Sequence, residues 1–430
     1  MPKVVVAEVT EETLQRAIDD IFTAFGGVTA LFPRQGKLFI KPNGIHFAPY
    51  THTAPQALAA LLAYLRQHGY RRLFVMENCT HGNFTRLVFK IAGYDRICRR
   101  YGARPVYLDE GRTVRITLPG EAEPVEIPRL LHDELIAHKG DNRYLSFPKL
   151  KTHSMTTVTL GVKNQMGLLV QRDRMVDHHF GLHERLTRIY RLIQPDFTLI
   201  EGLTATVHGH FPTTAHLDDC LVRLNVLFGG QDTVAVDAVG ARLLGYKPQE
   251  VEHLRLAAAA GLGCADLADI EVVGDLNRFQ TRYPHTLLRR FPPDVTIVQG
   301  QERACIEGCR GNTECVLEML GSDYGGRGGF SVVFGKGLPR EELERLQGDI
   351  LIVGPCAVAE AEEMVRNRYR HRRVYTSNEH NDLRAITTYL ARMTGVKPTD
   401  MVPLNPICTG LLLGWAKLHG LHARTPPLLG

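Results

Sequence analysis

The residues best suited to chemistry gather in one short segment, between positions 147 and 167. Two lysines alternate there and are followed by a histidine, and ten residues later a third lysine precedes an asparagine. Several ammonium groups in one crevice raise its affinity for an anion such as a carboxylate or phosphate, and an imidazole among them can transfer protons near neutral pH. Solvated loop lysines are the alternative interpretation. The predicted catalytic residues, which would act on a small anionic molecule, are Lys149, Lys151, His153, Lys163 and Asn164.

Other polar residues near this segment are candidates to bind a cofactor. Lys41 and Asn43 follow a short apolar run, and a histidine-rich group comes soon after the lysines. His179 and His183 are four residues apart, which would place both on one helix face, a spacing that suits one divalent metal ion. Gly181 lies between them and favours a helix that begins after it. Ordinary hydrogen-bonding histidines are the alternative. The predicted cofactor-binding residues are Lys41, Asn43, His178, His179 and His183.

Five of the nine cysteines lie in the last third of the chain. Three of them form the pattern C-x3-C-x5-C in what we expect to be a glycine-containing loop. A fourth follows Gly354 and Pro355 at an expected helix start, where the helix dipole favours a thiolate. Four thiolates can bind a [4Fe–4S] cluster or a zinc ion, and free thiols are the third interpretation. The predicted metal ligands are Cys305, Cys309, Cys315 and Cys356, with Cys408 as a replacement for one of them.

The elements that must position these residues are short apolar runs that alternate with helical patterns. Such alternation is typical of an α/β protein with a mostly parallel sheet and helices on both faces. In these sheets the carboxyl ends of the strands border the crevice that binds ligands, so we expect the segments at Lys41 and Lys149 to converge. The predicted strands are 37–40, 72–76, 105–108, 144–147, 197–201 and 221–228, and the predicted helices include 55–68 and 84–100.

A domain boundary is expected between Pro284 and Pro293, after a polar stretch. Beyond it, apolar runs and helical patterns alternate again between residues 349 and 393, which predicts a small Rossmann-like α/β domain. We therefore predict two domains, 1–285 and 286–430, the second of which carries most of the cysteines. Because ligand sites often lie between domains, we expect the second domain to cover the basic crevice with residues 321–329 or 378–381.

Six motifs follow one another between positions 41 and 263. They are KPN at 41–43, PKLKTH at 148–153, TLGVKNQMG at 159–167, PDFTLIEG at 195–202, GQDTVAVD at 230–237 and GLG at 261–263. In this order they resemble the motifs of domain of unknown function 362 (DUF362), over residues 1–275. The chain departs from that pattern at Glu201, where aspartate is usual, and at Gly209–Pro212, where members often have GDGP. The family brings no settled reaction, but some members carry iron–sulfur ferredoxin modules, so the resemblance implies redox chemistry by association.

Composition restricts the remaining function classes. The 430 residues carry a net charge of +5, with acids and bases mixed, which does not favour nucleic-acid binding. Because neither a secretory leader nor an apolar segment of about 20 residues is recognisable, we expect a cytoplasmic protein that does not enter a membrane. We interpret the chain as an iron–sulfur or other metal-dependent redox enzyme that acts on a small anionic substrate or cofactor and exchanges electrons with a partner. The alternatives are an enzyme similar to nickel-cofactor racemases and a non-enzymatic metal or cofactor carrier.

Overall fold

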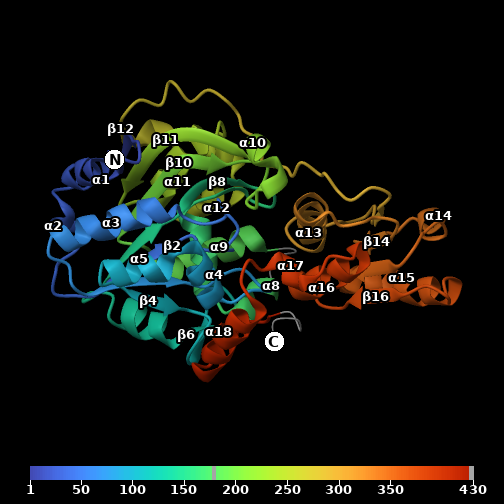
Figure 1. Cartoon of the computed structure of the whole chain (residues 1–430). Helices are drawn as coiled ribbons and strands as arrows, with labels where there is room; N and C mark the ends of the chain where they lie inside the picture. The colour runs from blue at the N-terminus through green and yellow to red at the C-terminus, as the bar shows by residue number, and fades with distance from the viewer. Residues whose placement is uncertain (177–180, 426–430) are drawn as a thin grey trace.

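One large sheet supports the first two-thirds of the chain in the computed structural model, which describes residues 1–176 and 181–425 (Figure 1). Its strands are β1 (Lys3–Glu8), β2 (Leu38–Pro42), β3 (Leu73–Glu77), β4 (Arg104–Tyr107), β7 (Arg143–Phe147), β8 (Lys149–His153), β9 (Thr157–Thr159), β10 (Phe197–Thr206), β11 (Leu221–Gly230) and β12 (Glu271–Val273). The order is β12-β1-β11-β10-β7-β2-β3-β4, and β8 and β9 branch from β10. From β10 to β4 all strands are parallel, whereas β11 is antiparallel to both neighbours. The predicted α/β class with a mostly parallel sheet is thus confirmed.

Helices cover both faces of this sheet, because its strands present apolar side chains alternately to either side. In β2, Leu38 and Ile40 pack in the cluster that contains α1 and α3, while Phe39 packs on the opposite side with α9. The helices α11 and α12 cover the β1–β11 end of the sheet. These helices are α1 (Leu14–Thr23), α3 (Pro55–Gln67), α9 (Leu182–Leu192), α11 (Thr233–Leu243) and α12 (Glu252–Ala259).

The lysine segment is itself a strand. The apolar pattern predicts a strand that ends before Pro148, and it does, but the chain re-enters the sheet at once as β8. Proline has no N–H to donate to a sheet ladder, yet the Pro148 carbonyl accepts a 3.0 Å hydrogen bond from the Glu201 N–H. Strand β8 then pairs with β10 and with β9. Because side chains alternate along a strand, Lys149, Lys151 and His153 share one face of β8.

A separate sheet of four parallel strands, in the order β13-β14-β15-β16, forms the expected second α/β unit (Figure 1). Its elements are β13 (Thr296–Gln299), α13 (Cys309–Tyr324), β14 (Ser331–Phe334), β15 (Ile350–Val353), α15 (Pro355–Arg368), β16 (Val374–Ser377) and α16 (Leu383–Thr394). The apolar side chains of the strands are buried between helices on both faces of this sheet.

The expected cysteine loop is wrong over residues 309–315, because α13 begins at Cys309. The glycines there do not mark a loop. A Cβ added at Gly311 would lie 2.0 Å from the Ile306 carbonyl oxygen, so glycine allows a close approach of the helix to its preceding segment. Six helical residues turn the chain through about 600°, so Cys309 and Cys315 lie about 120° apart around the helix axis. The two thiols therefore face different surroundings.

The chain connects the second unit to the first in two places. The linker 274–295 passes over one edge, where the Pro284 carbonyl accepts hydrogen bonds from the His208 N–H (2.8 Å) and the Thr152 hydroxyl (3.1 Å). After α16 the chain returns as α18 (Pro406–Leu418), which packs on α4 (Thr85–Ala92) through Leu413 and Ala416 (Figure 1). Within the described residues, no helix is both long enough and apolar enough to cross a membrane.

One buried carboxylate fixes the turn that carries the third lysine. Asp237 on α11 accepts hydrogen bonds from the N–H groups of Gly161 (2.7 Å) and Val162 (2.8 Å), the first residues of α7 (Gly161–Asn164). These N–H groups have no partner inside the helix. A side chain 75 residues away in sequence therefore positions Lys163 and Asn164 relative to the sheet.

We predict that Asp237→Ala lowers the free energy of unfolding by about 2–4 kcal/mol, because it leaves two buried N–H donors without an acceptor. Chemical denaturation followed by circular dichroism measures this change. The control is Asp218→Ala, which alters an exposed aspartate and should stay within about 0.5 kcal/mol of the wild type. Equal effects of the two substitutions would contradict the assigned role of Asp237.

Candidate functional site

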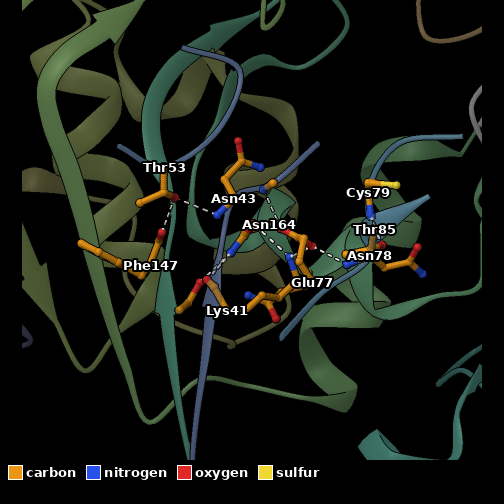
Figure 2. Close-up of polar contacts among 12 residues, drawn as sticks. Lys41, Asn43, Thr53, Glu77, Asn78, Cys79, Thr85, Phe147 and Asn164 are labelled. Carbon is orange, nitrogen blue, oxygen red and sulfur yellow. Dashed lines mark hydrogen bonds and ion pairs between the residues drawn. The ribbon is translucent and has the colours of Figure 1, made fainter. Parts of the chain in front are cut away.

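A buried ion pair lies at the carboxyl ends of β2 and β3 (Figure 2). The Lys41 Nζ lies 2.6 Å from the Glu77 Oε1, and neither side chain is more than 2% exposed. The Glu77 carboxylate also accepts hydrogen bonds from the N–H groups of Gly44 (2.7 Å) and Asn78 (2.8 Å). Burial lowers the pKa of Lys41, and the Glu77 carboxylate opposes that effect. Both partners are needed, since a single buried charge would be uncompensated.

The motif at 159–167 closes over this ion pair. The Asn164 side chain accepts a 3.2 Å hydrogen bond from the Lys41 ammonium, and its amide group donates to the Lys41 carbonyl (3.2 Å) and the Ser146 hydroxyl (3.1 Å). At Gly167, an added Cβ would lie 2.8 Å from Glu77 Oε1 and 2.9 Å from Lys41 Nζ. The motif therefore ends in glycine because the backbone touches the ion pair.

Lys151 lies beside this pair, under the loop that follows β2. Its Nζ donates to the Asn43 side-chain oxygen (2.5 Å) and to the Thr51 carbonyl (3.0 Å). Burial, together with the charges of Lys149 and Lys163, holds the pKa of Lys151 well below its usual range. The neutral amine can still donate both hydrogen bonds. Lys151 thus holds the loop in place, and it contributes less positive charge than the sequence suggests.

Lys163 differs from these lysines. Among residues 1–176 and 181–425, its half-buried side chain has no hydrogen-bond partner and no carboxylate within 4.0 Å. Burial, with the charges of Arg174 and Lys41, lowers the pKa of Lys163 to about 8. At neutral pH its side chain is therefore mostly an ammonium ion, which can attract an anion.

These groups border one cavity of about 120 Å³, which we call the cationic cavity. The residues that carry its chemistry are Lys41, Asn43, Glu77, Asn78, Lys151, His153, Lys163, Asn164, Arg174 and His210. The Arg174 guanidinium donates to the Asn78 side-chain oxygen (2.7 Å) and carbonyl (3.3 Å), which aligns it along the cavity wall. Lys41 is matched by Glu77, whereas Lys163 has no carboxylate partner among the described residues.

A pair of stacked imidazoles forms another part of the wall. The rings of His153 and His210 lie 4.0 Å apart with an angle of 8° between their planes. The Met155 N–H donates to Nδ1 of His153 (3.1 Å), so this nitrogen acts as the acceptor and the ring proton of neutral His153 is on Nε2. His153 therefore has a defined tautomer with one exchangeable proton.

The second unit completes the cavity with Asn312, Asn381 and Leu383. This confirms the expectation that residues 378–381 contribute to the wall. Asn381 adopts a left-handed conformation with φ of 56°, its side chain accepts a hydrogen bond from Asn312, and its N–H donates to the Cys309 Sγ at 3.4 Å. Asn381 thus connects the cationic cavity with the cysteines.

The predicted site residues do not all meet. Lys149 shares a face of β8 with Lys151, but it forms an ion pair with Glu201 (3.1 Å), whose carboxylate also accepts from the Ala54 N–H (2.9 Å). It does not line the cationic cavity.

His183 stacks on His253 with ring centroids 5.9 Å apart, and burial lowers the pKa of both. The predicted ligands His178 and His179 lie outside the described residues.

Three of the four predicted cysteine ligands border a second, smaller cavity of about 20 Å³, the thiol cavity. These three are Cys305, Cys309 and Cys356. The same cavity is also bordered by His380, Arg303, Arg310 and Lys336. Cys315 instead faces an apolar cavity on the other side of α13, and burial raises the pKa of its thiol to about 12. Cys408 is exposed on α18. Within the described part of the chain, no three His, Cys, Asp or Glu side chains are arranged to hold a metal ion.

Several cavity residues were not identified from the sequence, namely Glu77, Asn78, His81 and Arg174. Glu77 and Asn78 end β3 as Lys41 and Asn43 end β2. The carboxyl ends of neighbouring parallel strands lie at the same edge of the sheet, so the site could have been predicted to include Glu77 and Asn78. Arg174 gave no such indication, because its place depends on long-range packing.

The comparison with protein families agrees with this architecture. Residues 38–242 match the model of the family described as "Domain of unknown function (DUF362)". This range contains β2, β3, β7, β8 and both lysine motifs, that is, the first unit's share of the cationic cavity. The first unit therefore contains a DUF362 domain, and the match ends before the second α/β unit. No curated protein matches the sequence.

We predict that Gly167→Ala lowers the free energy of unfolding by about 1–3 kcal/mol, since the new methyl group would press on the Lys41–Glu77 pair. The control is Gly140→Ala, because a Cβ at Gly140 meets no atom within 4 Å and the backbone φ is not positive. Urea denaturation of both variants tests this. The contact would have no energetic weight if Gly167→Ala were as stable as the control.

Proposed function

We propose that the protein is an enzyme that binds a small organic anion in the cationic cavity. Lys163 and Arg174 hold the anionic group, and His153 transfers a proton to or from the substrate. The observation that carries the proposal is the ammonium group of Lys163, which borders a cavity without a carboxylate partner among the described residues. An unmatched charge in a sheltered site attracts a counter-ion strongly, because the surroundings screen it less than water does.

The lysine's lowered pKa also supports this proposal. A group whose pKa is displaced toward neutrality by burial and by nearby charges, and that faces a cavity, is a candidate for function. The carboxyl edge of the parallel strands is also where open α/β sheets bind ligands. His153 supports the proton-transfer step, since its tautomer is set by the Met155 N–H and its Nε2 proton is exchangeable.

We predict that sulfate binding weakens about 10-fold between pH 7 and pH 9. With a pKa of about 8, the protonated fraction of Lys163 falls from about nine-tenths to about one-tenth over this range, and only the ammonium form attracts the anion. Sulfate stays a dianion throughout, so the change reports on the protein. Isothermal titration calorimetry at several pH values measures it.

Two substitutions separate charge from structure in this experiment. Lys163→Arg should bind sulfate with little change between pH 7 and pH 9, and Lys163→Met should bind at least about 10-fold more weakly at pH 7. Lys139→Met, at an exposed lysine, should behave as the wild type. Wild-type affinity in Lys163→Met, or no sulfate binding at any pH, would refute the proposal.

We further propose that the thiol cavity binds a [4Fe–4S] cluster through Cys305, Cys309 and Cys356, with His380 as the fourth ligand. The support is that these four ligand-type side chains border one cavity. Such a cluster supplies one-electron transfer.

We predict that protein reconstituted anaerobically with iron and sulfide is brown, with broad absorption near about 400 nm from charge transfer between thiolate and iron. Cys305→Ser, Cys309→Ser and Cys356→Ser should each lose iron and colour. Cys315→Ser, whose thiol faces the other cavity, should keep both. Colourless protein with stoichiometric zinc would contradict the cluster, and loss of colour in Cys315→Ser would contradict this ligand set.

A further inference from the structure

The cationic cavity does not end at its charged wall. The apolar cavity that Cys315 faces, of about 150 Å³, lies against it between the two units, and we call it the apolar lobe. Six residues line both cavities, which makes them adjoining parts of one space. These shared residues are Ile45, Thr80, His81, His210, Asn312 and Leu383.

The wall of the apolar lobe suits an uncharged group. Both units supply it, and its apolar side chains include Phe47, Phe211, Val316, Met319, Met401 and Val402. Methionine side chains are flexible and adapt to ligands of different shape. Among the described residues that line this lobe, none is a lysine, arginine, aspartate or glutamate.

Three of the titratable groups that face the lobe, His46, Cys315 and Tyr324, stay neutral near pH 7. Burial lowers the pKa of His46 to about 3, and its ring packs on Phe47 at 4.0 Å. Burial raises the pKa of the Cys315 thiol to about 12 and also raises that of the Tyr324 hydroxyl. His81 and His210 lie where the two cavities meet, so they mark the border between the polar part and the apolar part.

From this arrangement we infer that the ligand is amphipathic: a carboxylate or phosphate group that carries an alkyl or aryl body. The anionic group lies against Lys163 and Arg174, and the apolar body extends past Ile45 and Leu383 into the apolar lobe. The inference rests on the proposed function, because it assigns the substrate class of the same site. It also gives the second unit a role in recognition, since α13 and α16 supply much of the lobe.

A series of alkyl phosphates tests the inference, with methyl, butyl, hexyl and octyl phosphate titrated into the full chain at pH 7, below their micellar concentrations. Burying one methylene group contributes enough free energy to raise affinity about 3-fold to 4-fold. We therefore expect affinity to rise with each added methylene until the lobe is filled. Alkyl carboxylates of the same lengths should follow the same trend.

A substitution that fills the lobe provides the matched variant. Thr387 on α16 lines the apolar lobe and is half-buried, so Thr387→Trp should remove most of the dependence on chain length while methyl phosphate and sulfate bind as before. Thr399→Trp is the control, because Thr399 is exposed and lines neither cavity. Circular dichroism and thermal unfolding check that both variants fold.

The outcomes separate this inference from the proposed function. If sulfate and methyl phosphate bind but affinity is independent of chain length, the amphipathic ligand is wrong and the anion site stands. The same conclusion holds if Thr387→Trp, correctly folded, keeps the wild-type dependence on chain length. If neither the phosphates, the carboxylates nor sulfate bind, both proposals fail.

Discussion

The buried ion pair between Lys41 and Glu77 is the interaction on which the rest of the structure depends. One carboxylate joins the ends of two strands, receives the N–H groups of Gly44 and Asn78, and lies against the backbone of Gly167. Loss of one partner from a buried pair typically costs about 3–5 kcal/mol. The fold and the cavity wall are therefore inseparable here, because the residues that shape the cavity also hold the sheet edge together.

The four lysines differ in whether an acidic side chain lies beside the ammonium group. Lys41 has Glu77, Lys149 has Glu201, and Lys151 is engaged by neutral oxygens with its pKa held low by burial. Lys163 alone among these four has no such partner in the described residues. Three of these four lysines thus have partners that hold them in the structure, and Lys163 has none among the described residues, although residue identity alone does not distinguish them.

The sequence predicted the features that depend on residues close together in the chain. Short apolar runs located the strands, and motifs at strand ends located Lys151, His153, Lys163 and Asn164 at the cavity. The partner of Lys149 lies 52 residues away on β10, so its neutralisation depends on strand pairing that the sequence does not state. In the same way, glycines near the cysteines indicated a loop, but packing extended a helix to Cys309 and turned Cys315 toward another cavity.

The two attachments of the second unit determine how the cavity can open. The linker is held at Pro284 on one edge of the sheet, and α18 is anchored on α4 at another (Figure 1). The two units also meet between these attachments, where the Ala215 N–H donates to the Asp323 carboxylate (3.1 Å) and His81 lies 4.0 Å from Asp382. Under the proposed function, a ligand that enters between the units would have to part α13 and α16 from the strand ends against these contacts. Release should then be slow whenever the ligand contacts both units, because the opening must break both sets of contacts together.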